Sequence, residues 1–373
     1  MSNLLIDIRP LLDKPYTGVA QYTLNFLNET LANDKENNYF LFYNSYGRVR
    51  ISRAEGERAL FGCYNSAKYQ NKDLPIFNYP NVRIVDFHYP NKIFNFLLWF
   101  FKWPKIDKLV EKRIGQKIDE IFLPNFNFFA FSKNKKITLV AHDLSFEIYP
   151  QFFTFKQRFW HKLVNPKKLC QMADKIITHS ENTKNDIIRF YKIDPSKIEI
   201  KKPVIAQKFF EAIDEKEKAR VKEKYQLPDN FIFYLGNLEP RKNIETLINA
   251  FHQLMISDSL LAISLIIAGR GKEQNKLKRR VNNLGVGERV RFLGYIPEED
   301  KKAIYHLAKV FVYPSFYEGY GYPVVEAISS NTLVITSHTS SLTEIESDKI
   351  IFINPNDIND LFQALKESMA KFL

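Results

Sequence analysis

Residues Phe311–Ser341 read FVYPSFYEGYGYPVVEAISSNTLVITSHTSS, and they combine the main signals that predict the architecture. The apolar run Ala308–Ser315, rich in Val and Phe and ended by Pro314, is typical of a strand that is buried on both faces. A helix is predicted to begin near Pro323, because proline has no N–H to lose in the first turn. A second apolar run follows, so the stretch predicts strand, turn, helix and strand in succession.

The turn between the first strand and the helix contains Glu318, Gly319, Tyr320, Gly321 and Tyr322. Two glycines allow a sharp bend or the close approach of a ligand to the backbone. The free N–H groups and the positive end of the helix dipole would face this turn, where they favour an anion such as a phosphate.

Two carboxylates belong to the same stretch, Glu318 on the turn and Glu326 in the first turns of the helix. A carboxylate accepts several hydrogen bonds, and its charge strengthens them, so both residues suit the hydroxyl groups of a sugar. The alternative is that Glu326 only complements the helix dipole and that Glu318 is solvated.

Composition limits the class of protein. The 373 residues exceed what one hydrophobic core usually supports, and 45% hydrophobic with 26% charged residues is ordinary for a globular protein. Cys63 and Cys170 have no metal-ligand spacing, which favours a reducing compartment and buried thiols. No basic and apolar leader follows Met1 and no run reaches roughly 18 apolar residues, so we expect neither secretion by that route nor a spanning helix.

The net charge of +12 predicts a polyanionic partner without choosing between nucleic acid, anionic lipid and nucleotide phosphate. Nucleic acid ranks last, because the basic residues are spread along the chain and form no known module.

Short apolar runs alternate with helical stretches in both halves of the chain, which is typical of crossover units on a parallel sheet. The predicted strands are Leu4–Ile8, Tyr39–Tyr43, Val82–Phe87, Ile118–Leu123, Ile137–Ala141, Lys175–Thr178, Phe231–Leu235, Leu261–Ala268, Arg289–Leu293, Val310–Tyr313, Leu333–Thr336 and Ile350–Ile353. The helices predicted among them include Gly18–Leu31, Phe155–Met172, Asn182–Tyr191 after a Ser180 cap, and Asn243–Phe251.

We therefore predict an α/β protein with two doubly wound domains that face each other across a cleft, residues 1–202 and 226–373. Residues 203–225 are predicted to be a linker followed by a solvated helix, since they are basic and dense in Lys and Glu. Ligands of such sheets bind outside the carboxyl ends of the strands.

Arg241 and Lys242 follow the strand Phe231–Leu235 and precede a helix. Arg grips a phosphate through two parallel donors and Lys adds a mobile charge, so the pair is a candidate phosphate site, with a solvated surface pair as the alternative. Gly269 and Gly271 lack the third glycine of a dinucleotide fingerprint, which removes the main support for a dehydrogenase and favours a tight turn.

Two candidates lie in the first half. Gly18 follows Thr17 at a helix start and could let a loop approach a phosphate. His142 ends a strand and could donate to a sugar or phosphate oxygen, or be a satisfied structural histidine.

Several motifs resemble the family 4 glycosyltransferases, which are retaining enzymes of the GT-B fold, and are most similar to its mannosyltransferase-like members. These motifs are Leu235–Asn249 (LGNLEPRKNIETLIN), Leu265–Gly271 (LIIAGRG), Val290–Gly294 (VRFLG), Tyr313–Ala327 (YPSFYEGYGYPVVEA), Val140–Tyr149 (VAHDLSFEIY) and Ala173–Asp186 (ADKIITHSENTKND). The chain ends at Leu373, soon after a helix predicted over Asp357–Phe372, whereas family members generally continue through further helices.

The resemblance implies a nucleotide-sugar donor, with Arg241 and Lys242 neutralising its diphosphate and Glu318 bonded to its sugar. It assigns Glu326 to the ribose and His142 to the transferred sugar. The remaining donor contacts that it implies are Gly18, Tyr295, Gly319, Tyr320, Gly321, Ser341 and Leu342.

By the same resemblance the enzyme transfers a hexose to a glycan or a polyprenyl-diphosphate-linked acceptor of cell-surface polysaccharide synthesis. The expected hexose is mannose and the expected donor is GDP-mannose, with UDP-sugars left open. No Asp-x-Asp triplet ends a strand, so we expect no cofactor and no obligatory metal, with the two cations in its place. A cytoplasmic location, at the inner face of the membrane, follows from such an acceptor.

Ile93–Trp103 (IFNFLLWFFKW) is the most apolar stretch and is too short to span a bilayer. It could lie at the headgroup level of a membrane as a peripheral contact. The alternatives are a helix packed between sheet and cleft, or a dimer face.

Two other functions stay open from the sequence. A non-catalytic, membrane-bound subunit of a glycosyltransferase pair would bind lipid without turnover. A nucleotide-sugar epimerase would interconvert the free donor without an acceptor.

Overall fold

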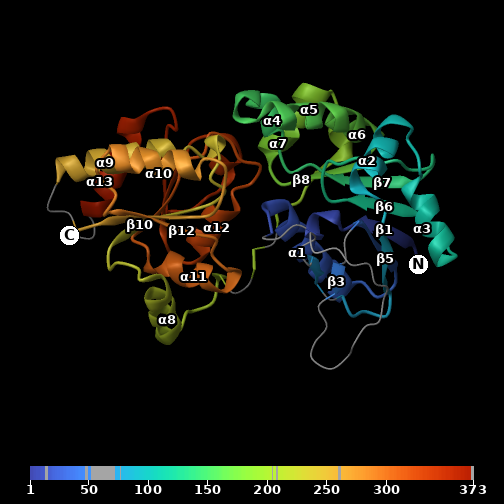
Figure 1. The fold of residues 1–373 in the computed structure, drawn as a ribbon, viewed down its shortest axis with the longest axis horizontal. Coiled ribbons are helices and arrows are strands. Elements are labelled where there is room, and N and C mark those ends of the chain that lie inside the picture. Colours follow the sequence, from blue (N-terminus) through green and yellow to red (C-terminus); the bar gives the residue numbers. More distant parts are fainter. Residues whose placement is uncertain are drawn as a thin grey trace. The chain divides into compact units, whose positions relative to one another are not determined.

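The computed structural model describes residues 1–12, 16–46, 49–51, 72–75, 77–203, 205–206, 209–258 and 262–370. The chain divides into two compact units (Figure 1). The first contains Met1–His142, Thr154–His179 and Lys184–Pro203, and the second contains Asp143–Phe153, Ser180–Thr183 and Val204–Leu373. Cys63 lies outside the described residues, and Cys170 is a buried free thiol whose pKa burial raises to about 12.

The first unit is built on a parallel sheet in which seven strands are described, in the order β5-β2-β1-β6-β7-β8-β9. Their bounds are β1 Asn3–Asp7, β2 Asn38–Asn44, β5 Val82–Phe87, β6 Glu120–Leu123, β7 Lys136–Val140, β8 Lys175–Thr178 and β9 Ile198–Ile200. A separate parallel pair joins β3 (Val49–Ile51) to β4 (Lys72–Leu74).

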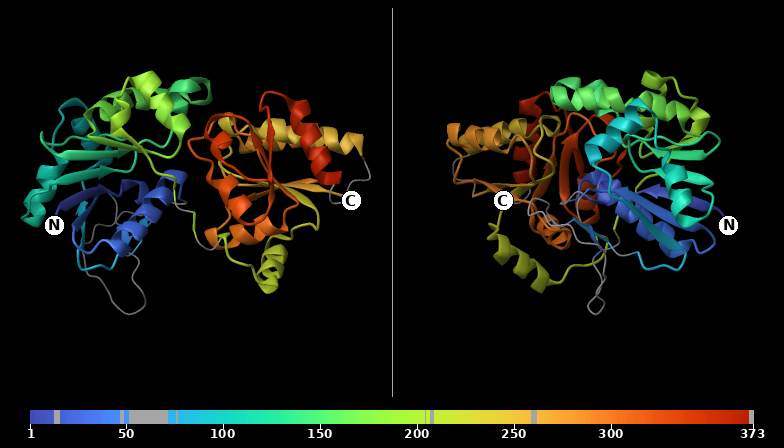
Figure 2. Two further views of the ribbon diagram at one scale, coloured as in Figure 1. Left: turned by 180° about the vertical axis from the view of Figure 1, so that it is seen from behind. Right: turned by 45° about the vertical axis from the view of Figure 1, so that its right-hand side comes forward.

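Helices cover both faces of this sheet. α1 (Gly18–Asn33) packs its buried Tyr22, Leu27 and Leu31 against β1 and β2. On the other face lie α2 (Asn91–Phe100), α5 (Phe155–Val164) and α6 (Pro166–Met172), as Figures 1 and 2 show. α3 (Ile106–Ile114) also belongs to this unit, whereas α4 (Ser145–Ile148) belongs to the second unit and α7 (Glu181–Asp186) has residues in both.

The second unit contains a parallel sheet of six described strands in the order β12-β11-β10-β13-β14-β15. Their bounds are β10 Phe231–Leu235, β11 Ser264–Ala268, β12 Val290–Gly294, β13 Val310–Tyr313, β14 Leu333–Ser337 and β15 Ile350–Ile353. The strand order reverses between β10 and β13, which is the switch point of a doubly wound sheet and the usual place for a ligand.

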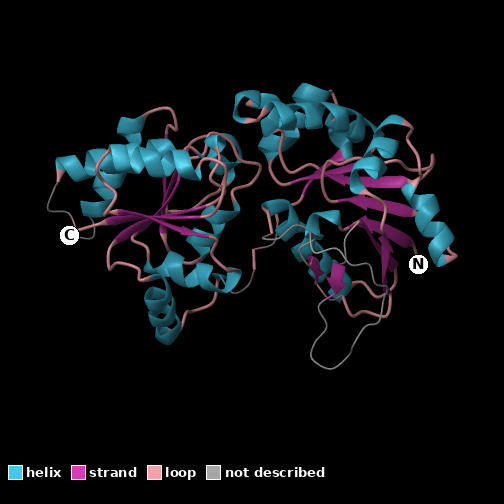
Figure 3. Cartoon of the chain, viewed as in Figure 1, coloured by secondary structure: helices cyan, strands magenta, loops and turns pink. Residues whose placement is uncertain are grey.

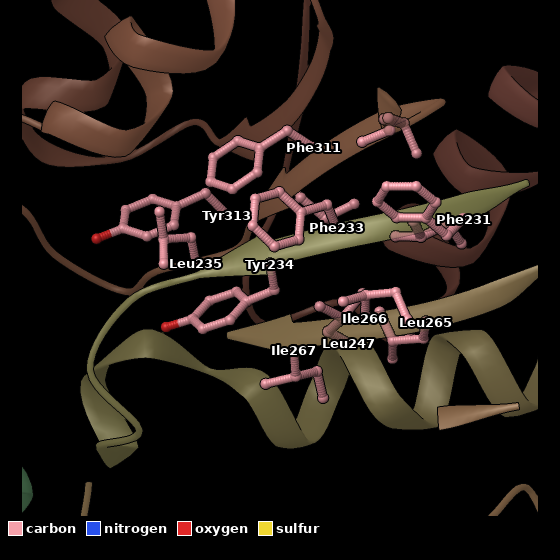
Figure 4. Close-up of a cluster of buried hydrophobic side chains, with 14 of the residues drawn as sticks. Phe231, Phe233, Tyr234, Leu235, Leu247, Leu265, Ile266, Ile267, Phe311 and Tyr313 are labelled. Carbon is pink, nitrogen blue, oxygen red and sulfur yellow. The ribbon is translucent and has the colours of Figure 1, made fainter. Parts of the chain in front are cut away.

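Helices lie on both faces of this sheet as well (Figures 2 and 3). α9 (Ile244–Ser257), α10 (Gln274–Asn283) and α13 (Ile358–Ala370) lie on one face, and α11 (Glu298–Leu307) lies on the other with α8 (Glu215–Tyr225) and α12 (Tyr322–Ser329) beside it. The strands are apolar on both sides because both faces are covered: Phe231, Phe233 and Phe311 are fully buried, as Figure 4 shows.

The predicted helix over Phe155–Met172 is wrong in one respect, because it is two helices. Asn165 has a left-handed backbone (φ 54°) and ends α5, and its side chain accepts from Lys168 N to begin α6 at Pro166. Asn tolerates that conformation better than most residues, and Pro favours a new first turn.

The predicted solvated helix before the second sheet is α8, and its residues other than Val221 are exposed or half-buried. α8 buries Val221, and its Arg220 and Lys224 reach the fully buried Asp300 of α11 at 2.6 Å each. The edge strand β9 was not predicted, since three residues carry too little periodic signal. Within the described residues, no helix is both long and apolar enough to cross a membrane.

Candidate functional site

The loops after β10 and β13 meet at the switch point of the second sheet. β10 runs into a single turn, Pro240–Lys242, and β13 runs into the segment that contains Glu318. The backbone N–H of Phe316 donates to the carbonyl oxygen of Arg241 at 2.9 Å, which fixes one loop against the other. The two predicted cations and the predicted carboxylate are therefore brought together by the topology of the sheet.

Glu318 lies between the two cations. Lys242 Nζ is 2.6 Å from its Oε1, and Arg241 Nη1 is 3.3 Å from its Oε2. Lys242 Nζ also donates to the hydroxyl of Tyr313 at 2.7 Å, and Arg241 donates to the carbonyl oxygen of Tyr317 at 2.6 Å and to Glu239 at 2.9 Å. The side chains of Lys242 and Glu318 are each 8% exposed. The alternative that Arg241 and Lys242 form a solvated surface pair is therefore wrong.

This burial sets the charges of the cluster. Burial alone would raise the pKa of Glu318, but the charges of Lys242 and Arg241 outweigh it and lower that pKa to about 2. Burial, followed by the charge of Arg241, lowers the pKa of Lys242. For Arg241 burial acts in the same direction, but Glu318 and Asp143 hold the pKa of the guanidinium above its usual value. The carboxylate is therefore ionised and orients both cations before any ligand arrives.

The loop after β14 also contacts the turn that contains Glu318. The hydroxyl of Ser340 accepts from the backbone N–H of Glu318, and the hydroxyl of Ser341 donates to its carbonyl oxygen, both at 2.9 Å. Gly321 has φ +96°, and a Cβ there would lie 2.7 Å from Cδ2 of Leu342. Ser341 and Leu342 thus lie against Gly319–Gly321, as a cradle built from both loops requires.

Glu326 lies inside α12 and is 8% exposed. Its carboxylate accepts from the buried hydroxyl of Tyr305 at 3.0 Å and lies 3.6 Å from Lys301 of α11. Burial would lower the pKa of Lys301, but Glu326 and Glu298 raise it. Tyr295 follows β12 and is half exposed, and Tyr320 and Tyr322 contact each other edge to face. The ribose role of Glu326 stays a prediction.

The glycines after β11 have a packing role. A Cβ on Gly269 would lie 1.8 Å from the carbonyl oxygen of Gly236, and one on Gly271 would lie 2.1 Å from that of Leu238. Only glycine lets these backbones approach so closely. The glycines thus hold the loop after β11 against the loop that carries Arg241.

Segment Asp143–Phe153 belongs to the second unit and packs on the turn before Glu318. Phe152 stacks on Phe316 with ring centroids 5.3 Å apart, and Tyr149 contacts Tyr317 at 6.1 Å. The loop after β14 holds the short segment Ser180–Thr183 in a similar way, since Glu344 accepts from the backbone N–H groups of Glu181 and Asn182 at 2.9 and 2.7 Å.

In the first unit His142 lies at the end of β7 beside His179, which ends β8. His142 Nε2 is 2.7 Å from the carbonyl oxygen of Pro124, and its Nδ1 is 3.1 Å from Nε2 of His179. His179 Nδ1 lies 2.9 Å from the carbonyl oxygen of Lys201. The ring of Tyr22 contacts both imidazoles, at 5.0 and 4.7 Å.

The contacts of the two imidazoles with Pro124, with Lys201 and with each other need three N–H protons if all are hydrogen bonds, whereas two neutral imidazoles carry two such protons. The pair is complete only when it binds a third proton and becomes cationic. Burial and then His142 oppose this, because they lower the pKa of His179 to about 3. Gly18 lies in the first, exposed turn of α1 with open space around it.

Sequence reasoning missed Tyr313, Tyr317, Ser340 and His179 as parts of these clusters. Each lies at the carboxyl end of a strand or in the loop that follows, so position alone could have nominated them. Their partners come from other loops, and that pairing carries no signal in the sequence.

Two family models match the chain. The family described as Glycosyl transferases group 1 matches residues 215–371, and the one described as Glycosyltransferase Family 4 matches residues 58–203. Together they account for the first unit from residue 58 and for almost all of the second.

Known proteins agree with this. O-antigen chain mannosyltransferase B of Escherichia coli is 31% identical over 245 residues, which are 65% of this chain and 64% of that protein, or less than two thirds of its length. The N-acetylgalactosamine-N,N'-diacetylbacillosaminyl-diphospho-undecaprenol 4-alpha-N-acetylgalactosaminyltransferase of Campylobacter jejuni is 27% identical over 288 residues, 74% of this chain and 73% of that protein.

Among solved structures, sucrose-phosphate synthase from Thermosynechococcus elongatus has a TM-score of 0.68 at 20% identity, covering 99% of this chain and 90% of that one, which shows a shared fold. With one family model matched on each unit and both sheets doubly wound, the chain contains a Glycosyltransferase Family 4 domain and a Glycosyl transferases group 1 domain, and it has the GT-B fold.

Proposed function

We propose that this glycosyltransferase transfers a hexose, mannose, from GDP-mannose to a lipid-linked glycan, and that the anomeric configuration of the mannose is retained. The observation that carries the proposal is the pair of buried cations, Arg241 and Lys242, oriented by Glu318 at the switch point of the second sheet. Two fixed positive charges in a site of low dielectric suit a diphosphate leaving group.

The reaction breaks the bond between the sugar C1 and the diphosphate oxygen, and the bonding electrons leave with the nucleoside diphosphate. The acceptor oxygen attacks C1 on the same face, and its proton passes to the departing diphosphate. Arg241 and Lys242 neutralise the developing charge, which is the main catalytic task, and take the place that a metal ion has in other enzymes. We expect turnover to persist in a chelator.

The other contacts follow from the cradle around Gly319–Gly321. The cluster holds Glu318 beside the diphosphate, where its carboxylate accepts hydrogen bonds from hydroxyl groups of the sugar, and the carboxylate of Glu326 accepts hydrogen bonds from the ribose hydroxyls. The proposed further donor contacts are Gly18, His142, Tyr295, Gly319, Tyr320, Gly321, Ser341 and Leu342.

The names of the relatives support the substrates. The Escherichia coli relative is an O-antigen chain mannosyltransferase, and the name of the Campylobacter relative contains a diphospho-undecaprenol acceptor. The net charge of +12 suits phosphate-bearing substrates and an anionic membrane surface, and we propose peripheral contact through Ile93–Trp103 at the cytoplasmic face.

The first test is thermal stabilisation by GDP-mannose, GDP, UDP-glucose, UDP-N-acetylglucosamine and UDP, since a ligand that binds the native state raises apparent stability. We expect a shift with GDP-mannose and GDP that Arg241→Ala and Lys242→Ala abolish. Lys272→Ala, an exposed lysine in the loop after β11, is the matched control and should leave the shift intact. A shift with a UDP-sugar instead would replace the donor, and no shift with any nucleotide would refute the proposal.

Turnover separates this proposal from a non-catalytic subunit and from an epimerase. Lys242→Ala should lower kcat by about 100- to 1,000-fold, the usual effect of removing one preorganised donor. NMR of the product should show the anomeric configuration of the donor. Inversion of that configuration, or conversion of free donor without acceptor, would contradict the proposal.

A further inference from the structure

The first unit holds a cavity of about 440 Å³ that the donor site does not use. Its wall is formed by loop 127–131 after β6, the end of α5, α6, and the turn that follows α2. Most of the lining is apolar, including Phe128, Phe129, Phe131, Leu163, Leu169 and Met172. Its volume lies within the roughly 300–1,000 Å³ range of small-molecule sites.

Every charged residue in the lining is a lysine: Lys102, Lys105, Lys162 and Lys168. None of the four forms an ion pair with a described residue, whereas other lysines of this unit, such as Lys108 and Lys135, bind Glu111. Burial, then the charges of Lys168 and Lys105, lower the pKa of Lys102, so these cations are close enough to repel one another. An apolar cavity with unpaired lysines in its lining suits an anion that is attached to an apolar group.

The surface around the cavity has the same character. α2 and the turn after it expose Phe96, Phe100, Phe101 and Trp103, and α5 exposes Phe155 to 75% and Phe159 to 52%. Phe96 stacks on Phe100, and Phe155 stacks on Phe159. α2, α5 and α6 lie along the same side of this unit (Figure 1). The alternative that Ile93–Trp103 is a helix packed between sheet and cleft is therefore wrong for at least half of its side chains, because these side chains are exposed to solvent.

The two segments that border the cavity contain no acidic residue. Residues 91–105 have three Lys, and residues 154–172 have five Lys or Arg. A second copy of the chain is a poor occupant, because a two-fold interface would place this basic patch against itself. Free phosphate or a nucleotide is also a poor occupant, because neither fills an apolar cavity.

We propose that this cavity binds the apolar chain of a polyprenyl phosphate or diphosphate, the carrier of the acceptor glycan, with Lys102, Lys105, Lys162 and Lys168 on its phosphate groups. The exposed aromatic side chains of the two bordering segments would then lie at the level of lipid headgroups. This inference deepens the proposed function, on which it rests for the identity of the carrier.

The chain contains its own probe for this site. Its three tryptophans are Trp99, Trp103 and Trp160. Trp99 lines the cavity, and the other two lie in the bordering segments, with Trp103 61% exposed. Tryptophan emission therefore reports on the cavity and not on the donor site.

The experiment titrates the full-length protein with farnesyl diphosphate, a soluble chain with the same head group, below its micellar concentration. We expect a saturable change in tryptophan emission, with at least tenfold weaker binding of farnesol and of inorganic diphosphate. The double variant Lys162→Glu/Lys168→Glu should weaken binding of farnesyl diphosphate by tenfold or more and leave farnesol unchanged. Lys156→Glu/Lys167→Glu changes exposed lysines of the same segments outside the lining and is the matched control.

Several results would overturn the inference: no saturable binding of farnesyl diphosphate, equal weakening by both double variants, equal binding of inorganic diphosphate, or binding to phosphatidylglycerol vesicles alone. Light scattering that shows a dimer dissociated by Lys162→Glu/Lys168→Glu would assign the patch to a second copy. Thermal shifts with GDP-mannose are measured on the same variants. Donor binding without farnesyl diphosphate binding refutes this inference alone, and the reverse refutes only the proposed function.

Discussion

Glu318 is a carboxylate that the fold has removed from water and surrounded with positive charge. Its pKa of about 2 in the native state lies below the ordinary value of 4.5. The native state therefore binds this proton less readily than the unfolded state does. The stability that ionised Glu318 contributes is complete above pH 4.5 and is lost as the pH falls toward 2.

We therefore expect Glu318→Gln to flatten the acid limb of the stability curve. In the wild type this group lowers the free energy of unfolding by up to about 1.4 kcal/mol per pH unit in that window. Urea midpoints from pH 6 to 2.5 measure the slope, with exposed Glu367→Gln as the control. An unchanged slope in Glu318→Gln would show that the ion cluster does not form in solution.

His179 is the second residue whose charge the fold controls. Burial and His142 lower its pKa from 6.5 to about 3, so the unfolded state takes up this proton first as the pH falls. We expect the protein to lose stability between pH 6.5 and 3 through this group, and His179→Gln to remove that part of the loss. Exposed His88→Gln is the control.

The histidine pair also gives a spectroscopic expectation. NMR of the ring nitrogens should show His179 neutral at pH 6, with a proton on one of its two ring nitrogens and none on the other. A His179 that titrates near pH 6.5 would mean that the pair is hydrated and that the count of three contacts is wrong.

At the scale of elements, the start of α12 and the loop after β14 fit each other only because residue 321 is glycine. An added Cβ would meet Leu342 at 2.7 Å on a backbone with φ +96°. We expect Gly321→Ala to destabilise the protein by about 1–3 kcal/mol and to abolish the donor shift. Gly285→Ala is the matched control, because it has a similar positive φ (+69°) and open space around it.

A double-mutant cycle isolates the steric part. Leu342→Ala alone removes a fully buried side chain at a cost of about 2–5 kcal/mol, yet it also makes room for the new methyl group. The loss in the double variant should therefore be smaller than the sum of the single losses. Additive losses would mean that Gly321 is needed for its backbone conformation alone.

α8 depends on one buried carboxylate of α11. Asp300 is fully buried and accepts from Arg220, Lys224 and the hydroxyl of Tyr225, each at 2.6 Å. Asp300→Ala leaves two cations that are already partly exposed and can be hydrated, so we expect a loss of about 1.5–3 kcal/mol, as for other charged hydrogen bonds.

The exposed neighbour Glu299→Ala is the control for Asp300→Ala and should change stability by less than about 0.5 kcal/mol. Amide hydrogen exchange should show faster exchange in Glu215–Tyr225 for Asp300→Ala only. Exchange that rises equally across the second unit would indicate general unfolding and contradict a local role.

For the whole molecule, the two proposed ligands should protect different units. GDP should slow amide exchange in the loops after β10, β13 and β14, and farnesyl diphosphate should slow it in residues 91–105 and 154–172. Hydrogen exchange with each ligand alone measures this, with UDP and farnesol as controls. Protection of one common set of peptides by both ligands would contradict two separate sites.

Much of the fold was predictable because its signals are local. Fully buried parallel strands such as Phe231–Leu235 and Val310–Tyr313 appear as short apolar runs, and their bounds were predicted to the residue. The turn at Gly319–Gly321 and the helix after it follow from glycine and proline chemistry. The break at Asn165 was missed, because the apolar spacing continues through it.

Strand and turn preferences act over a few residues, and so the sequence alone predicts two parallel sheets and places Arg241, Lys242 and Glu318 in loops that follow strands. Three features appear only in the folded chain: Glu318 binds both cations out of water, His142 contacts His179, and residues 91–105 and 154–172 enclose one cavity. These contacts join segments that are far apart in the chain. Their energies depend on burial and on distances of a few ångströms, which arise only when the sheets, loops and helices have packed.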